Sequence, residues 1–238
     1  MILKASAIAL RKINYGDSSL IVQFYSAEYG LFSAMVRGAR KKKGKMKANL
    51  FEPLSLLELV MYRKENHQMG TLSDAKPSHH LNSIRNNIYK TTIVLYCAEL
   101  LQKTLKEEVA SPAQFTFLIQ SILWLELSKD RFANFPLAFM CQLTKHLGFL
   151  PSDFDGEYFD YIEGQFVSNA PIHEWQCSGD LAQAMSQMFQ SDLNAAATIK
   201  LNHKQRRLIL SELIRFYSLH IEGLGKMKSK EVLEQLLN

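Results

Sequence analysis

The sequence predicts an α+β protein in which a small five-stranded β-barrel precedes an all-α domain. Residues 3 to about 75 contain five short runs rich in aromatic and β-branched residues, with few helix signals between them. Pro77 and the polar residues 78–82 interrupt this pattern, and from Ile84 the apolar residues recur with the period of a helix. We therefore expect two domains, at residues 1–80 and 81–238.

Turn residues separate the predicted strands. The second and third runs are joined by Ser26-Ala-Glu-Tyr-Gly30, in which Gly30 can supply the positive φ of a hairpin turn. Five short strands in so few residues favour a closed barrel of the OB type, which holds single-stranded nucleic acid in a groove edged by loops. The predicted strands are residues 7–13, 20–25, 31–36, 54–62 and 70–75.

Capping residues and helical periodicity define the second domain. Ser111 and Pro112 give an N-cap followed by proline at the first helical position, and Pro136 begins a helix that Gly148 ends. Residues 151–176 are acidic and aromatic without a helical period, which indicates an irregular insert or a small hairpin. The other expected helices are about 84–105, 180–190, 204–221 and a short last one capped by Ser229.

Most of the positive charge lies in one segment. The chain has 28 lysines and arginines against 23 aspartates and glutamates, and seven of the 28 lie at residues 37–47, where there is no acid. The remaining count is 28 − 7 = 21 against 23. Like charges at this density repel one another, whereas a polyanion releases counterions for each phosphate neutralised. The segment therefore predicts a nucleic-acid-binding loop after the third strand; the alternative is a solvated basic loop or a localisation tag.

The candidate nucleic-acid-binding residues are the cations of this segment and four others at or near predicted strand ends. Strand aromatics such as Tyr15, Phe24, Tyr25, Tyr29 and Tyr62 would stack on bases if they face the groove, although most strand aromatics in a small barrel belong to the core. The candidate cations are Arg37, Arg40, Lys41, Lys42, Lys43, Lys45, Lys47, Arg11, Lys12, Arg63 and Lys64.

The sequence does not favour a metal site. Cys141 and His146 lie on one predicted helix about 140° apart, so they do not converge on zinc with His173 and Cys177. The acidic run 153–160 has the composition of a calcium loop but lacks its glycine and terminal glutamate at the required places. We therefore expect no metal.

Catalysis is not favoured either. The chain has no nucleophile elbow, P-loop or zinc-protease motif, and no carboxylate is spaced to orient His67, His79 and His80. The three cysteines are odd in number and widely spaced, which indicates a reducing compartment. There is no signal peptide and no apolar run of the roughly 18 residues that cross a bilayer. We expect a non-enzymatic, cytoplasmic, nucleoid-associated protein without membrane contacts.

A series of short motifs extends along nearly the whole chain. In the first part these are Tyr15-Gly-Asp-Ser-Ser-Leu-Ile-Val22, Glu28-Tyr-Gly-Leu31, Arg37-Gly-Ala-Arg-Lys41 and Leu50-Phe-Glu-Pro-Leu54. Later come Asn134-Phe-Pro-Leu-Ala-Phe139, Leu147-Gly-Phe-Leu-Pro151, Phe216-Tyr217 and Lys228-Ser-Lys-Glu-Val-Leu233. Each motif is loose, but their succession is similar to that of the RecO family of DNA recombination mediators.

This resemblance implies an N-terminal OB fold followed by a helical domain. It also implies binding of single- and double-stranded DNA, annealing of complementary strands, and help to RecA in replacing single-strand-binding protein, with RecR as partner. Many members hold zinc in two Cys-x-x-Cys pairs near residues 150–180. Because this chain has only Cys177 there, we expect the family's zinc site to be absent and no cofactor to be bound.

Two other functions stay open on the sequence. One is a non-catalytic adaptor whose helical domain binds partner proteins while the barrel serves as scaffold. The other is a nonspecific RNA-binding OB protein, since a groove that reads the backbone accepts RNA as well as DNA. Affinity that falls steeply with salt and depends on the basic segment would favour nucleic acid, whereas a salt-insensitive protein complex would favour the adaptor.

Overall fold

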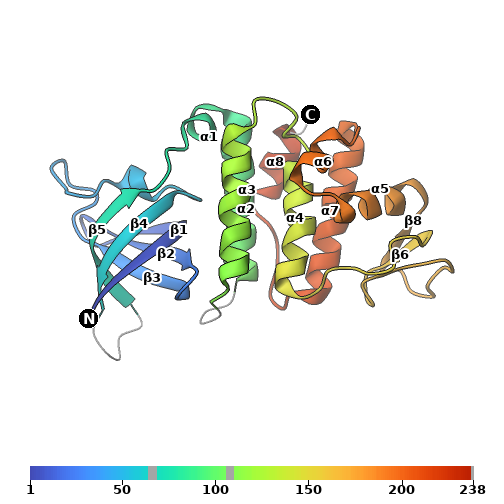
Figure 1. Cartoon of the computed structure of the whole chain (residues 1–238), viewed down its shortest axis with the longest axis horizontal. Coiled ribbons are helices and arrows are strands. Elements are labelled where there is room, and N and C mark those ends of the chain that lie inside the picture. The colour runs from blue at the N-terminus through green and yellow to red at the C-terminus, as the bar shows by residue number, and fades with distance from the viewer. Residues whose placement is uncertain (64–68, 106–109, 237–238) are drawn as a thin grey trace. The chain divides into compact units, whose positions relative to one another are not determined.

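The computed structural model describes residues 1–63, 69–105 and 110–236 (Figure 1). The chain divides into two compact units, Met1–Glu126 and Leu127–Asn238. The first unit contains the strands that were predicted to form the barrel and the helices that follow them directly. The chain changes from strands to helices near residue 80, where the domain boundary was expected. The boundary between the two compact units lies later in the chain, after Glu126.

A closed five-stranded barrel forms the first part of this unit and confirms the predicted fold class. Neighbouring strands follow the order β1-β2-β3-β5-β4, and all pairs are antiparallel except β3 with β5. A five-stranded barrel with this crossover corresponds to the OB fold. The strands are β1 (Ile2–Tyr15), β2 (Ser19–Ser26), β3 (Gly30–Val36), β4 (Leu56–Tyr62) and β5 (Met69–Pro77).

The strands are strongly staggered against one another. A path from each residue to its partner on the next strand runs once round the barrel. It starts at Ile13 of β1 and returns to the same strand at Ile2, eleven residues earlier (13 − 2). A stagger of this kind requires the strands to tilt against the barrel axis. The circuit passes through Ile13, Ile21, Met35, Thr71, Tyr62 and Ile2.

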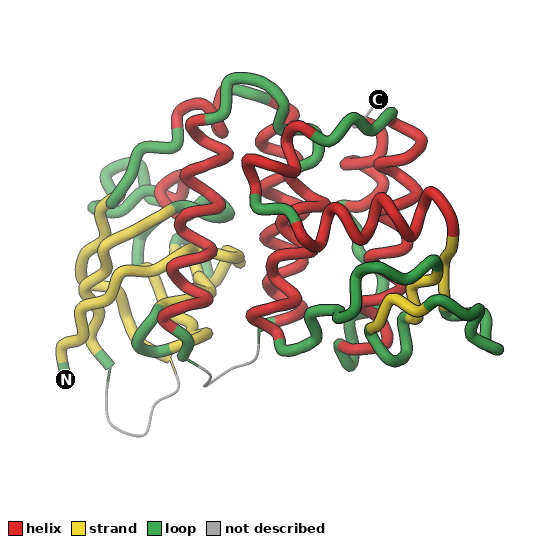
Figure 2. Tube along the Cα trace, turned by 45° about the vertical axis from the view of Figure 1, so that its right-hand side comes forward, coloured by secondary structure: helices red, strands yellow, loops and turns green. Residues whose placement is uncertain are grey.

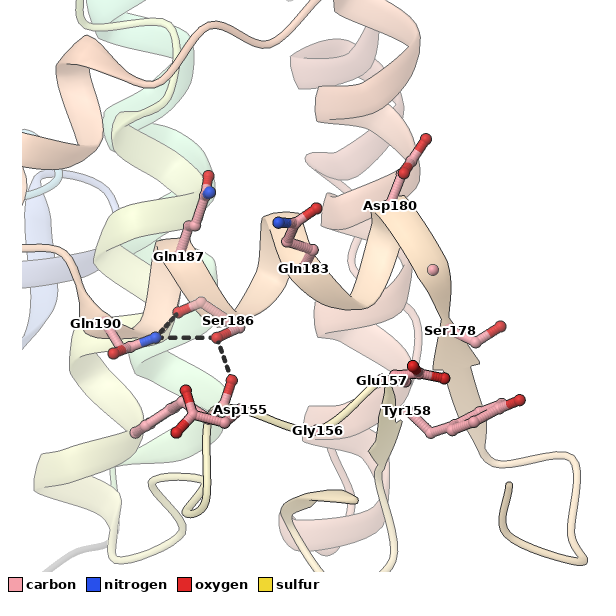
Figure 3. A pocket seen from close by; sticks show the side chains of 12 residues that line it. Asp155, Gly156, Glu157, Tyr158, Ser178, Asp180, Gln183, Ser186, Gln187 and Gln190 are labelled. Atoms are coloured by element: carbon pink, nitrogen blue, oxygen red, sulfur yellow. Dashed lines mark hydrogen bonds between the residues drawn. The ribbon is translucent and has the colours of Figure 1, made fainter. Parts of the chain in front are cut away.

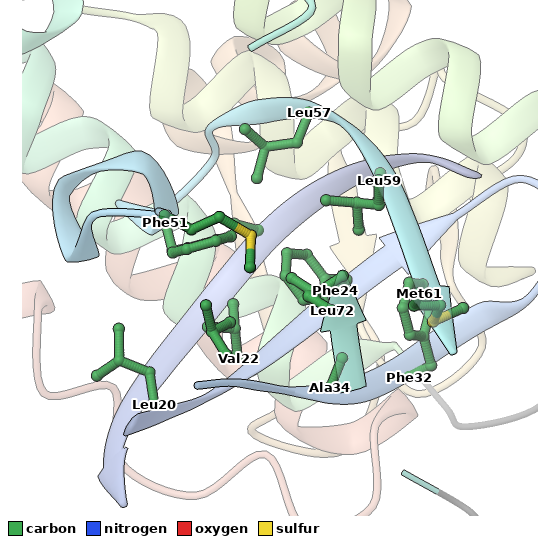
Figure 4. Packing of buried hydrophobic residues seen from close by; sticks show 14 of the residues in the cluster. Leu20, Val22, Phe24, Phe32, Ala34, Phe51, Leu57, Leu59, Met61 and Leu72 are labelled. Atoms are coloured by element: carbon green, nitrogen blue, oxygen red, sulfur yellow. The ribbon is translucent and has the colours of Figure 1, made fainter. Parts of the chain in front are cut away.

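The barrel interior is filled by the alternate, inward-facing residues of each strand (Figure 4). Phe24 is fully buried, with its ring centroid 5.5 Å from that of Phe32 and 6.1 Å from that of Phe51. Phe51 ends the short 3-10 helix η1 (Ala48–Phe51), which thereby brings a large side chain into the core between β3 and β4. Phe24 is thus part of the core and has no surface on which a base could stack.

Three helices complete the first unit: α1 (Asn82–Asn86), α2 (Ile88–Thr104) and α3 (Pro112–Leu127). Ile8 and Leu10 face away from the barrel interior, yet both are fully buried, and α2 contacts β1. The Gln102 side chain donates to the Leu10 carbonyl at 3.0 Å. The buried Tyr25 hydroxyl donates to Gln114 of α3 at 2.8 Å, so Tyr25 also belongs to the interior. Helices therefore cover one side of the barrel.

The second unit is helical with a small sheet (Figure 2). Gly148 adopts φ +86° after α4, which confirms its predicted role at the end of that helix. The insert at 151–176 forms a hairpin, β6–β7, and β8 pairs with the other edge of β6. The elements are α4 (Phe135–Leu147), β6 (Tyr158–Asp160), β7 (Gln165–Val167), β8 (Gln176–Ser178), α5 (Gly179–Gln190), α6 (Leu193–Thr198), α7 (His203–His220) and α8 (Lys230–Leu236).

Candidate nucleic-acid interface

The segment at residues 37–47, here called the basic loop, has a defined conformation between β3 and η1. Its apolar residues Ala39 and Met46 are 2% and 7% exposed and belong to the barrel core. The amide of Lys41 donates to the Gly38 carbonyl and that of Gly44 to the Lys41 carbonyl, each at 3.0 Å. The loop is therefore two successive turns fixed to the barrel at both ends.

Gly44 is required at the end of the second turn, where the loop folds back onto Gly38. A Cβ at this position would lie 2.2 Å from the Gly38 carbonyl oxygen and 3.2 Å from its carbon. These are backbone atoms, which cannot rotate aside as a side chain would. Gly38 itself has φ +68°, a conformation that glycine adopts without steric cost. The two glycines thus let the loop fold back on itself with its lysines outside.

The cations of the loop fall into two groups. Lys45 contacts Asp74 at 3.1 Å, and the ammonium group of Lys47 donates to the carbonyls of Lys41 and Lys42. The Arg40 guanidinium donates to the Gly16 carbonyl in the turn between β1 and β2. These three side chains hold the loop in place. The second group is Lys41, Lys42 and Lys43, whose side chains are exposed and form no bond with the residues that the structure describes.

Of the remaining candidate cations that the structure describes, Arg37 begins the loop and the others lie at separate places on the barrel. Arg11 is exposed on the outer face of β1, and Arg37 is exposed directly after β3. Lys12 points the opposite way from Arg11 and forms a 2.6 Å ion pair with Glu52, next to η1. Its charge is therefore already balanced by an acid.

Arg63 follows β4 and is half-buried; its backbone amide and carbonyl both bond to Met1, at 3.0 and 2.9 Å. Lys64, like His67, lies outside the described residues. The structure thus brings Arg37, Arg40 and the five loop lysines into one loop, while Arg63 lies where β4 ends beside the start of β1.

A polar hollow of about 750 Å³ in the second unit has the opposite charge (Figure 3). Asp155, Glu157 and Asp180 line it together with glutamines of α5. Ser186 donates to the Phe154 carbonyl at 2.8 Å and accepts from the Gln190 amide at 2.9 Å. Three acids would repel phosphates, so this hollow does not extend the basic surface.

The residues weighed as zinc ligands do not form a cluster. Among the described residues, no group of three or more histidines, cysteines and carboxylates is placed to hold a metal ion. His173 lies 3.3 Å from Asp160, and the Cys177 sulfur lies 3.7 Å from that of Met185. Burial raises the pKa of the Cys177 thiol to about 11 and that of Cys141 well above its usual value. Both thiols are therefore protonated at neutral pH in the metal-free protein.

The chain has an OB-type barrel with an anchored basic loop, followed by a helical unit. These features place it in the class of OB-barrel proteins that act by binding. A family model for the N-terminal part of recombination protein O matches residues 1–81, and one for its C-terminal part matches residues 85–231. The chain is 32% identical over 241 residues to the DNA repair protein RecO of Azobacteroides pseudotrichonymphae, covering 100% of both chains. It is 33% identical over 239 residues to that of Christiangramia forsetii, covering 99% of both.

The chain therefore belongs to the RecO family of DNA repair and recombination proteins, which are non-catalytic recombination mediators. This confirms the family and the non-enzymatic class predicted from the sequence. The comparisons concern the whole chain and not single side chains, so the candidate cations stay predictions. In the part of the chain that the structure describes, no helix is long and apolar enough to cross a membrane.

Proposed function

We propose that this protein binds single- and double-stranded DNA through its barrel, promotes annealing of complementary strands, and helps to load RecA onto single strands coated with single-strand-binding protein. RecR is the proposed partner in this reaction, and the proposed place is the nucleoid in the cytoplasm. The anchored basic loop is the observation that supports DNA binding most directly, and family membership supports the rest.

The loop suits phosphates for two physical reasons. Lys41, Lys42 and Lys43 present three uncompensated charges on adjacent residues, and each phosphate they neutralise releases condensed counterions. The backbone that carries them is already ordered by Ala39, Met46 and the turns, so binding costs little further backbone conformational entropy. Phosphate contacts carry no base information, which is appropriate for a mediator that acts on any sequence.

A salt titration of the full-length protein against single-stranded DNA, duplex DNA and RNA tests this function. We expect measurable binding to both forms of DNA, with log–log salt slopes of about −0.7 per phosphate contacted on single strands and about −0.9 on duplex. Tighter binding of RNA than of DNA would favour the RNA-binding alternative. The absence of any nucleic-acid complex at low salt, together with a salt-insensitive complex with RecR, would favour the protein adaptor.

We also propose that the protein needs no zinc. Residues 151–178 contain a single cysteine, and the sheet they form packs through aromatic rings: the Phe159 centroid lies 4.4 Å from that of Phe166 and 5.0 Å from that of Phe216. Elemental analysis of the purified protein should find far less than one zinc per chain, and a strong chelator should leave the circular dichroism and DNA binding unchanged. About one zinc per chain, lost together with helical signal on chelation, would contradict this.

A further inference from the structure

A second hollow of the helical unit, of about 560 Å³, is lined by three cations from three segments of the chain. Arg131 precedes α4, Lys200 lies between α6 and α7, and Arg206 belongs to the first turn of α7. The described residues that line this site, here called the basic hollow, include no acid. It shares no lining residue with the acidic hollow of the same unit, so the two are separate sites of opposite charge.

The charges of the basic hollow are not neutralised within the described part of the chain. Arg131 and Lys200 are exposed, and none of the three cations has an ion-pair partner among the residues that the structure describes. Arg206 is half-buried, and its guanidinium donates to the Leu201 carbonyl, while its Nε has no partner among these residues. Burial lowers the pKa of this guanidinium, since no acid compensates its charge. An anion in the hollow would supply that compensation.

Hydrogen bonds fix the walls of the basic hollow. The buried side-chain amide of Asn134 donates to the carbonyls of Ala196 and Ile199 at 2.9 Å each, which joins the start of α4 to the segment between α6 and α7. Asn202 and Gln205, which also line the hollow, form a capping box at the start of α7. The positive end of the dipole of this 18-residue helix therefore lies beside the cations. An anion would bind to a backbone that is already ordered.

We propose that the basic hollow binds the phosphates of a second DNA strand while the basic loop of the barrel binds the first. This inference rests on the proposed function, because annealing requires two strands to meet, and it adds the site that holds the second one. Three cations from three segments suit a polymer of phosphates, each of which releases counterions when neutralised. A single carboxylate would use only one guanidinium, through two parallel hydrogen bonds.

The test is a double variant, Arg131→Gln with Lys200→Gln, which removes two exposed charges and keeps long polar side chains. The probe is a single strand of about ten nucleotides, within the site size of one OB barrel. Sedimentation at low salt should find a second strand on the full-length wild type. Losing two contacts of about 0.7 each should weaken second-strand binding roughly 25-fold at 0.1 M salt, if both proteins converge near 1 M. The annealing rate should fall too, whereas the affinity for the first strand should not change.

Two further variants serve as controls. Lys145→Gln with Lys228→Gln removes two exposed lysines of the same unit that do not line the hollow, and should bind and anneal like the wild type. Arg131→Lys with Lys200→Arg keeps both charges in the hollow and should retain second-strand binding. Thermal melting of each variant within a few degrees of the wild type verifies folding.

The possible results are separable. If the wild type binds only one strand, or if the folded double variant binds a second strand and anneals as the wild type does, the inference is overturned although the proposed DNA binding stands. If the wild type binds no DNA, the proposed function fails together with the inference. Equal losses in the double variant and the Lys145/Lys228 control would assign the effect to net charge and overturn the inference. Inorganic phosphate that raises the melting temperature of the wild type but not of the double variant, with no second strand bound, would assign the hollow to a small phosphate ligand instead.

Discussion

Replacing Lys41, Lys42 and Lys43 with alanine is expected to flatten the log–log salt slope of single-stranded DNA binding by about 2 units. The value follows from about 0.7 per phosphate contact, three times over. If the two proteins converge near 1 M salt, the variant binds on the order of a hundredfold more weakly at 0.1 M. The loss should be similar for all sequences, because phosphate contacts do not distinguish bases. Fluorescence anisotropy over a salt series measures both quantities.

This triple variant should fold as well as the wild type. The three side chains are exposed and form no bond with the described residues, so the melting temperature should change little. A charge-matched control is Lys129→Ala, Lys145→Ala and Lys204→Ala, which removes three exposed lysines from the other unit. Equal slopes for the triple variant and the wild type would show that the loop is not the DNA site, whereas equal losses in both variants would show that net charge and not the loop determines binding.

By charge alone the five loop lysines are equivalent, but the structure does not support that equivalence. Lys47 bonds carbonyls of its own loop, and Lys45 contacts Asp74 on β5. Removing all five should therefore loosen the loop as well as discharge it. The partners of these lysines are defined only by the folded turns, and Asp74 lies 29 residues away in sequence (74 − 45), so no local pattern indicated them.

Local patterns did predict the strands and most helices. The hairpin of β2 and β3 follows from alternation and from Gly30, which adopts φ +59°. The six-residue helix α6 was missed because it is too short to show a period, and an Asp192 cap is its main signal. Local patterns did not indicate that helices pack on the outside of β1, because Ile8 and Leu10 look like ordinary strand residues until a helix covers them.

The pairing of one strand with the next shows a different limit. Ile13, Ile21 and Met35 each fit the alternation expected of their own strand, and nothing in one strand states which residue of the next lies beside it. These side chains are cross-strand neighbours only because the register of the folded barrel pairs Ile13 with Ile21 and Ile21 with Met35. Lys12 illustrates the same point, since its 2.6 Å ion pair with Glu52 depends on how η1 packs.

The second large effect is expected in the helical unit, where Phe159→Ala should lower the free energy of unfolding by about 3–5 kcal/mol. Phe159 is fully buried in the small sheet, and its ring centroid lies 5.6 Å from that of Phe189 on α5 and 5.0 Å from that of Phe216 on α7. Truncation removes these contacts and leaves a cavity between two helices and a sheet whose strands have only three residues each. Urea unfolding followed by circular dichroism measures the loss.

The neighbouring substitution Tyr158→Ala is the control, because Tyr158 is half-buried on the opposite face of the same strand and should cost far less. Polar attachments to α7 remain in the Phe159→Ala variant: the buried Tyr161 hydroxyl donates to Glu212 at 2.7 Å, Arg215 pairs with the same carboxylate at 2.8 Å, and the His220 ring bonds to the Tyr161 carbonyl at 2.8 Å. These bonds cannot replace the rings, since they leave the volume of the missing side chain unfilled. A loss below about 1 kcal/mol, with unfolding on chelation instead, would mean that a metal and not this aromatic cluster holds the insert.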